Sequence, residues 1–186
     1  MNETIKVIMN RRSHRKYKAD QIDEEKLQAI MECAIHAPSG MNQQKWHFTV
    51  IQNKNIIDEM VKRAKENLKN SDIEFLAKRA EDPAFNLYYY APTVVVITVD
   101  EKAPFTEIDC GAAAENIALA AESFNIGSCL IAMSGFIFQG EGVEELKKQL
   151  GIPENYRHVI SVALGYKENE NQLVSPKNTD VINYIR

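Results

Sequence analysis

Two short segments carry more polar chemistry than a turn or a helix end requires. The first, RRSHR, places Arg11, Arg12, Ser13 and Arg15 within five residues. Guanidinium groups form paired hydrogen bonds with phosphate, and a serine hydroxyl can add another. The alternatives are a solvated basic face, which is the commoner fate of such runs, and a nucleic-acid patch, which the net charge of −4 opposes. By itself this segment leaves the choice between an anion site and a solvated face open.

The second segment, APSGMNQQKWHF, covers residues 37–48 and lies between a helical pattern and a strand pattern. Asn42, Gln43 and Gln44 supply more amides than a turn needs. Amides both donate and accept hydrogen bonds, so they match the edge of a nitrogen heterocycle. A turn whose amides face water is the alternative. The combination of an anion-binding segment with a heterocycle-binding segment favours a nucleotide-like cofactor.

The apolar spacing predicts the elements that position these segments. Pro38 ends the second helix, Gly151 caps the last one, and the β-branched run at 93–99 is typical of a strand covered on both faces. The alternation of helices and strands predicts an α/β or α+β sheet with helices packed against it. We expect helices over 3–12, 23–37, 55–69, 107–125 and 143–151, and strands over 46–53, 93–99, 127–133 and 157–166.

Composition indicates one globular domain spanning residues 1–186, with 45% hydrophobic residues and mixed charges. No apolar run approaches the roughly 18 to 20 residues of a membrane span, and the N-terminus lacks an apolar signal stretch. Cys33, Cys110 and Cys129 are isolated in apolar runs, so we expect core-filling thiols in a reducing, cytoplasmic compartment. The terminal VINYIR is expected to dock elsewhere, for example on another subunit.

Several common catalytic patterns are absent from the sequence. It has no GxGxxG after a strand, no P-loop, no GxSxG, no HExxH and no Cys/His cluster. We therefore predict no metal site and assign no side chain a catalytic role. If the protein is an enzyme, its reactive atom is expected to belong to a cofactor.

Five segments together resemble the nitroreductase family, the FMN-dependent NAD(P)H oxidoreductases. RRSHRKYK and DEEKLQAIMECAIHAPSGMNQQKWHF resemble its N-terminal signature. YYYAPTVVVITVD, IDCGAAAENIALAAESFNIGSCLI and ISVALGYKE resemble its central strand, its Ala-rich helix with the next strand, and its late strand. The resemblance covers essentially the whole chain. It implies an α+β (α/β three-layer) fold, with a central mixed sheet flanked by helices, in an intertwined homodimer.

The resemblance also implies roles for individual residues around a tightly bound FMN. Arg11 would bind the phosphate, Ser13 the phosphate or ribityl chain, and Arg15 the pyrimidine edge, with Arg12 in the same group. The further residues implied are Pro38, Ser39, Gly40 and Asn42 from the partner subunit, Ala132, Met133, Ser134 and Gly135 against the ring, and Lys177 at the phosphate.

The implied activity is hydride transfer from NAD(P)H through flavin to a small acceptor such as a nitroaromatic or quinone, with no nucleic-acid or membrane partner. The alternatives are specialised chemistry, such as dehalogenation or flavin fragmentation, and a non-catalytic flavin-binding module. Two departures from the family pattern are Lys45, where a proline is usual, and Thr179, where some members have a second basic residue. Residues 70–90 are expected to cover the substrate.

Overall fold

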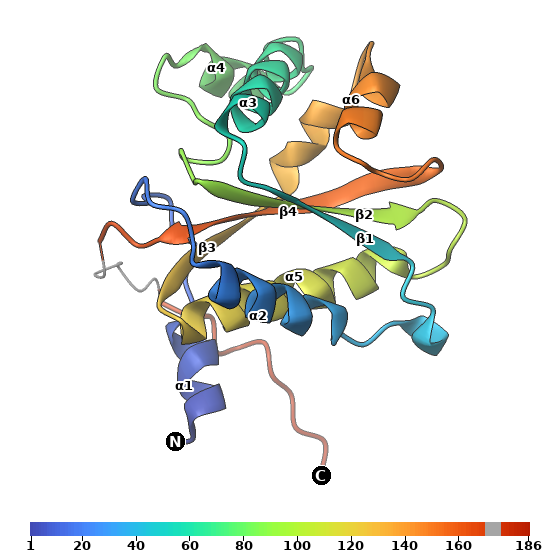
Figure 1. Ribbon diagram of the computed structural model, residues 1–186. Helices are drawn as coiled ribbons and strands as arrows, with labels where there is room; N and C mark the ends of the chain where they lie inside the picture. Colours follow the sequence, from blue (N-terminus) through green and yellow to red (C-terminus); the bar gives the residue numbers. More distant parts are fainter. Residues whose placement is uncertain (170–175) are drawn as a thin grey trace.

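The computed structural model describes residues 1–169 and 176–186, and Figure 1 shows a central sheet with helices on both faces. The α-helices are α1 (Glu3–Asn10), α2 (Glu24–Ile35), α3 (Lys54–Lys69), α4 (Glu74–Glu81), α5 (Thr106–Ser123) and α6 (Val143–Gln149). α2 and α5 lie against one face, while α3 and α6 lie against the other, with α4 beside α3. These layers confirm the predicted α+β, three-layer fold.

The sheet contains β1 (Trp46–Ile51), β2 (Thr93–Asp100), β3 (Ile126–Ile131) and β4 (Tyr156–Tyr166), in the order β1-β2-β4-β3. All three pairings are antiparallel, whereas a mixed sheet was expected. The reason is visible at β1 and β2: Ile51 ends β1 opposite Val94 at the start of β2. The connection through α3 and α4 therefore returns to the same end of the sheet. β3 forms one edge.

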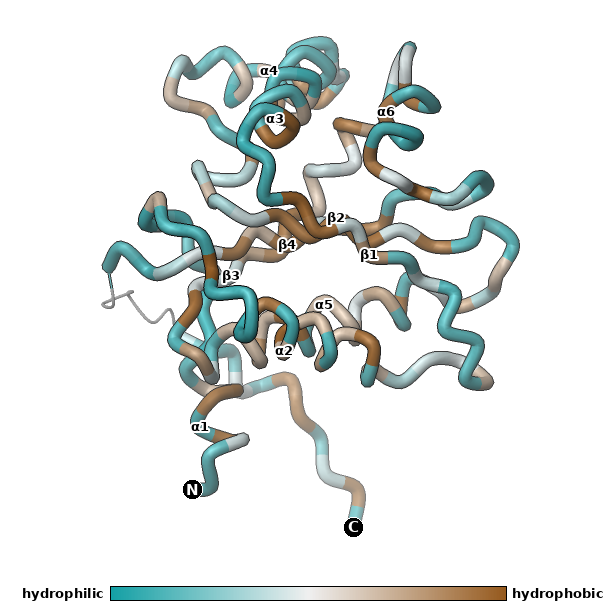
Figure 2. Tube along the Cα trace, viewed as in Figure 1, coloured by the Kyte–Doolittle hydropathy of each residue, from teal (hydrophilic) through white to brown (hydrophobic). Residues whose placement is uncertain are grey.

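The central strand β2 is buried on both faces, as its β-branched sequence predicts. Val94 and Val96 belong to the core on the α3 side. Val95, Ile97 and Val99 belong to the core on the α2 and α5 side. Alternate side chains of a strand point to opposite faces, so one strand serves both cores. Figure 2 shows the hydrophobic colouring concentrated on the sheet, with hydrophilic colouring on the outer helices.

The helical pair α2 and α5 packs closely because α5 is rich in alanine. Ala114, Ala118 and Ala121 have no exposed surface, and small side chains let neighbouring backbones approach. Asn116 Nδ2 of α5 donates to the Cys33 carbonyl of α2 at 2.9 Å. The pair forms the helical layer on one face of the sheet, and α1 lies beside this layer (Figure 1).

The cysteines only partly follow the prediction of core filling. Cys110 and Cys129 are buried, one in each core, and burial raises the pKa of both thiols, that of Cys110 to about 12. Cys33 is exposed, so its prediction as core filler is wrong. It lies on α2 outside the stripe of Leu27, Ile30 and Ala34 that faces the core. The prediction was based on the apolar residues around Cys33 in the sequence, which do not show the face of the helix on which it lies.

Two elements differ from the expected pattern. β3 ends at Ile131, and residues predicted as its last positions belong to the 3-10 helix η2 (Ala132–Phe138). Ser134 causes the early turn, because its hydroxyl donates back to the Ile131 carbonyl. α4 was not predicted, since it is only eight residues long and buries only Ala80.

The C-terminal segment 176–186 is exposed throughout and runs away from the α2 and α5 layer on the same side as α1 (Figure 1). Val181, Ile182, Tyr184 and Ile185 are all more than 60% exposed. Within the described ranges, no helix combines the length and the apolar character that crossing a membrane requires.

Candidate functional site

The basic segment 11–15 leaves α1 and runs beside the edge strand β3. α1 ends at Arg11. Ser13 then forms a parallel bridge with Ser128, and the backbone N–H of His14 donates to the Ser128 carbonyl at 2.8 Å. After Ser13 the chain runs to the end of β4, where Tyr17 bridges Lys167 and the Lys18 N–H donates to the Tyr166 carbonyl at 2.9 Å. Segment 11–15 therefore lies beside the edge strand β3, and segment 132–135 directly follows this strand.

Arg11 and Arg12 have different surroundings. Arg11 Nε lies 3.3 Å from Glu115 Oε1 on α5, and both side chains are partly exposed. Arg12 Nη1 donates to the carbonyls of Met9 and Arg11 at 2.6 and 2.8 Å. These bonds satisfy carbonyl groups at the C-terminus of α1, which a cation also stabilises through the helix dipole. Arg12 therefore caps the C-terminus of α1. The Arg11 side chain instead extends toward Glu115 of α5.

Arg15 lines a cavity of about 490 Å³. Its guanidinium is 5.7 Å from the centre of the Tyr89 ring, within cation–π range. Other wall residues are Lys16, Arg79, Phe85, Asn86 and Tyr90. The cavity therefore combines positive charge with aromatic faces, beside the segment that the sequence assigned to a cofactor.

Asn86 is a site candidate that sequence reasoning missed, because only the aromatic side chains of 85–90 were considered. Its Oδ1 accepts from the backbone N–H groups of Tyr88 and Tyr90 at 3.0 and 3.1 Å. Tyr89 and Tyr90 have positive φ angles, 55° and 59°, which cost energy for residues other than glycine. Asn86 holds this turn and retains an Nδ2 donor at the cavity wall. Its signal was the single amide between Phe85 and Leu87.

The segment 11–15 rests on a tightly packed base. A Cβ at Gly127 would lie 2.9 Å from His14 Cβ, so only glycine allows this approach. Lys167 Nζ contacts both carboxylate oxygens of Glu122 at 2.9 Å, and both side chains are nearly buried. Burial and the neighbouring Lys167 lower the pKa of His14 below its usual value. The base is therefore rigid and holds the imidazole neutral.

The segment 132–135 forms the first turn of η2. Ala132 is exposed, Met133 packs partly against the core, and Ser134 is fully buried. Ser134 Oγ lies 2.9 Å from His158 Nε2 on β4. Since the Ser134 hydroxyl donates to Ile131, it accepts from His158, which must carry its proton on Nε2. The side chain of Ser134 therefore anchors the turn to β3 and β4.

The amide-rich loop is separated from segment 11–15 within the chain. It contains the short 3-10 helix η1 (Gly40–Asn42), at the opposite end of the helical layer from α1 (Figure 1). Gly40 N–H donates to both oxygens of Asp109, at 3.2 Å each. Met41, Asn42 and Gln44 all have φ near +50°. Three residues of one exposed loop therefore adopt the left-handed conformation, which costs energy for residues other than glycine.

Pro38 and Ser39 flank that loop, and Ser39 Oγ accepts from the Gln44 N–H at 3.1 Å. Lys45, which replaces the usual proline, has its Nζ 3.5 Å from Asp100 Oδ2, so its added charge is paired. Lys177 is exposed in the C-terminal segment. Its predicted contact with a phosphate, like the predicted cofactor contacts of the other residues, stays a prediction.

Titratable groups are not gathered as metal ligands in the part of the chain that the structure describes. No group of three or more histidine, cysteine, aspartate or glutamate side chains there could hold a metal ion. The chemistry available at this edge consists of guanidinium and amide donors, aromatic faces and backbone groups.

The sequence profile of the nitroreductase family matches residues 8–166. The chain belongs to the nitroreductase family. A nitroreductase from Bacteroides fragilis, solved with bound FMN, is 36% identical and superposes with a TM-score of 0.92 over the full length of both chains. A nitroreductase from Desulfitobacterium hafniense, also solved with bound FMN, gives the same identity, coverage and TM-score. An NADPH-flavin oxidoreductase of Vibrio harveyi is 30% identical over 95% of this chain and 70% of its own.

The matched range of this nitroreductase-family chain includes both motifs singled out in the sequence. RRSHR and APSGMNQQKWHF lie within residues 8–166, and the segment 176–186 lies beyond them. Likeness in fold extends further than the family profile, because the two solved nitroreductases superpose over the whole chain. The predicted family and fold are thus confirmed.

Proposed function

We propose that this protein is an FMN-dependent oxidoreductase that passes electrons from NAD(P)H to a small acceptor such as a nitroaromatic or quinone. The observation that carries the proposal is the bridge between Ser13 and Ser128, which places the basic segment beside β3, the strand that leads into η2. Family membership and the FMN in the two solved nitroreductases support the cofactor. Three free cysteines support a cytoplasmic location.

The groups along this edge fit FMN, taken from its phosphate to its ring. Arg11 and Ser13 offer charged and neutral donors suited to the phosphate and ribityl chain. Arg15 and Asn86 line one cavity and suit the pyrimidine edge, which presents acceptors and a donor. The turn at 132–135 would offer backbone groups to the ring. In this proposal Arg12 contributes by holding the end of α1 rather than through its own donors.

Bound FMN supplies the hydride-transfer chemistry, which no side chain of the chain provides. Arg15 would place a fixed positive charge beside the pyrimidine edge, where it would favour the reduced, anionic form of the cofactor. His158 and Ser134 hold the turn that faces the ring. No side chain acts as acid or base, so solvent supplies the protons of the reduced product.

We also propose a homodimer in which Pro38, Ser39, Gly40 and Asn42 contact the cofactor of the second copy. The support is indirect. The loop lies away from the basic segment of its own chain (Figure 1). Apolar residues that would suit a subunit interface are exposed on α1 and on the C-terminal segment, namely Ile5, Ile8, Met9, Val181, Ile182, Tyr184 and Ile185. Such a large apolar surface is typical of an interface.

The decisive experiment is an absorbance spectrum of the purified protein, followed by anaerobic titration with NADH or NADPH. We expect a yellow protein whose flavin absorbance bleaches with the nicotinamide and returns when a nitroaromatic or quinone is added. A colourless protein that takes up no added FMN would contradict the proposal. A yellow protein that neither nicotinamide reduces would instead indicate a flavin-binding module without turnover.

A further inference from the structure

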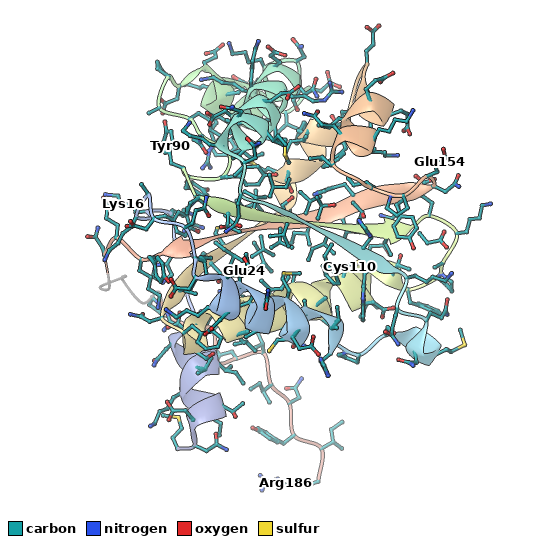
Figure 3. The ribbon with its side chains drawn as sticks, in the orientation of Figure 1. Lys16, Glu24, Tyr90, Cys110, Glu154 and Arg186 are labelled. Carbon is teal, nitrogen blue, oxygen red and sulfur yellow. The ribbon has the colours of Figure 1, made fainter. Side chains whose placement is uncertain are left out.

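The cavity beside Arg15 extends beyond the groups that would hold a flavin. Its lining also includes Arg79, which α4 contributes, and Lys16 from the N-terminal segment. Figure 3 labels Lys16 and Tyr90, which lie at the same end of the molecule, near the end of the sheet beneath α4. Three cations from two distant parts of the sequence therefore surround one open space.

Arg79 is held in place by aromatic side chains. Its Nη2 lies 3.4 Å from the Tyr89 hydroxyl, and its guanidinium is 5.9 Å from the centre of the Phe85 ring. Arg15 lies over the ring of the same Tyr89. Tyr89 thus lies between two guanidinium groups and sets their spacing. Asn86 holds the strained turn that carries Tyr89, so the backbone fixes the position of the ring between the two guanidinium groups.

The positive charge of this wall is not neutralised by ion pairs. Among the residues that the structure describes, Arg15, Lys16 and Arg79 form no salt bridge with a carboxylate. Asp82 and Glu168 also line the cavity, so its wall holds three cations and two anions when only the described residues 1–169 and 176–186 are counted. However, Asp82 Oδ1 accepts from the backbone N–H of Ala84 at 2.8 Å and so caps a turn.

Aromatic faces complete the cavity. Phe85 and Tyr89 are partly buried against the core, whereas Tyr90 is 69% exposed at the rim. Stacking between aromatic rings is modestly stabilising and depends on their relative orientation. A carboxylate accepts charge-assisted hydrogen bonds from a guanidinium group. A flat ring bearing an anionic group would satisfy both features at once.

We propose that this cavity selects aromatic electron acceptors that carry an anionic substituent, and that Arg79 is the specificity-determining residue. The inference rests on the proposed function, because it names the acceptor class for the same site. The ring of the acceptor lies among Phe85, Tyr89 and Tyr90, and its carboxylate meets Arg79. For a nitroaromatic acceptor, reduction of the nitro group to the nitroso group consumes one NAD(P)H and one proton and releases NAD(P)⁺ and water.

The test compares two nitroaromatic acceptors in the FMN-loaded protein, 4-nitrobenzoate and the neutral 4-nitrobenzamide. We expect Arg79→Gln to lower kcat/KM about tenfold for 4-nitrobenzoate and to leave 4-nitrobenzamide within about twofold, as for loss of one charge-assisted hydrogen bond. The matched control is Lys78→Gln, which removes the same charge from the adjacent exposed position outside the cavity wall. Comparing ratios between variants cancels the difference in intrinsic reactivity of the acceptors.

Benzoate, which accepts no electrons, gives an independent reading. It should inhibit the reduction of 4-nitrobenzamide competitively in the wild-type protein, and Arg79→Gln should weaken this inhibition by a similar factor. Equal losses for both acceptors, or no loss for either, would overturn the inference while leaving the oxidoreductase intact. A variant that raises KM for NADPH but not for NADH, with both acceptors unchanged, would assign Arg79 to the reductant's phosphate and also overturn it.

Discussion

Ser134 Oγ and His158 Nε2 lie 2.9 Å apart, joining the turn at the end of β3 to the neighbouring strand β4. The imidazole also stacks on Phe138, with ring centres 4.8 Å apart. Ser161 Oγ lies 3.2 Å from the same nitrogen and accepts from the Tyr88 hydroxyl. The turn proposed to face the cofactor is therefore fixed from behind by a hydrogen-bonded network with a histidine at its centre.

This network predicts a specific loss of stability in acid. Burial lowers the pKa of His158 to about 4, below the value of about 6.5 expected in the unfolded chain. Between these values the unfolded state binds more protons, so the free energy of unfolding decreases as the pH falls from 7.5 to 5. His158→Gln keeps an N–H donor for Ser134 but does not titrate. Between pH 7.5 and pH 5, the free energy of unfolding of this variant should decrease by about 1 to 2 kcal/mol less than that of the wild type.

Urea unfolding of both proteins at pH 7.5 and pH 5 measures the difference. His14 also has a lowered pKa, but it is present in both proteins and cancels in the comparison. Identical pH dependence in the two proteins would show that the His158 imidazole is protonated as easily in the folded state as in the unfolded chain.

Replacing Gly127 tests the base under the basic segment. A Cβ there would lie 2.9 Å from His14 Cβ, so Gly127→Ala should displace the segment from β3. We expect about 1 to 3 kcal/mol of destabilisation together with weaker FMN retention. The control is Gly111→Ala in α5, where a Cβ meets nothing within 4 Å and should stabilise the helix by about 0.5 to 1 kcal/mol. Thermal unfolding and flavin fluorescence follow both effects, and normal flavin retention in Gly127→Ala would contradict this prediction.

Arg11→Ala should weaken FMN binding by about 1.5 to 3 kcal/mol, as expected for loss of a charge-assisted hydrogen bond. Fluorescence titration of the apoprotein with FMN measures the dissociation constant. Lys6→Ala serves as control, since Lys6 lies on α1 and pairs only with the exposed Glu3. If the affinity of Arg11→Ala matched that of the control, the basic segment would be a solvated face.

Charges placed in the exposed apolar surface should separate the proposed dimer. Ile8 and Ile182 are 51% and 62% exposed in the single chain. If they are buried in an interface, a carboxylate at either position would be unpaired and strongly unfavourable there. Ile8→Glu with Ile182→Glu should shift the sedimentation coefficient from dimer to monomer and lower flavin occupancy. Lys54→Glu, an exposed change at the start of α3, should alter neither. A wild-type protein that sediments as a monomer with full flavin occupancy would refute the interface.

Much of the fold followed from local sequence patterns. The apolar stripe of α2, the β-branched run of β2 and the turn at Gly151 each depend on periodicity or on one backbone preference, and all three appear in the structure. Gly151 has φ +67° directly after α6. Residues 132 and 133 and helix α4 were misassigned or missed because a side-chain hydrogen bond and sparse burial decide them.

The sequence by itself determined the family, the alternation of elements and the two polar motifs, because these are properties of neighbouring residues. Only the tertiary structure decided that segment 11–15 pairs with β3, that Cys33 faces solvent and that Lys45 is neutralised by Asp100. It also brought Arg79 and Asn86 to the cavity of Arg15. Residues far apart in the chain meet only through the packing of the layers, and the pattern of neighbouring residues does not predict such contacts.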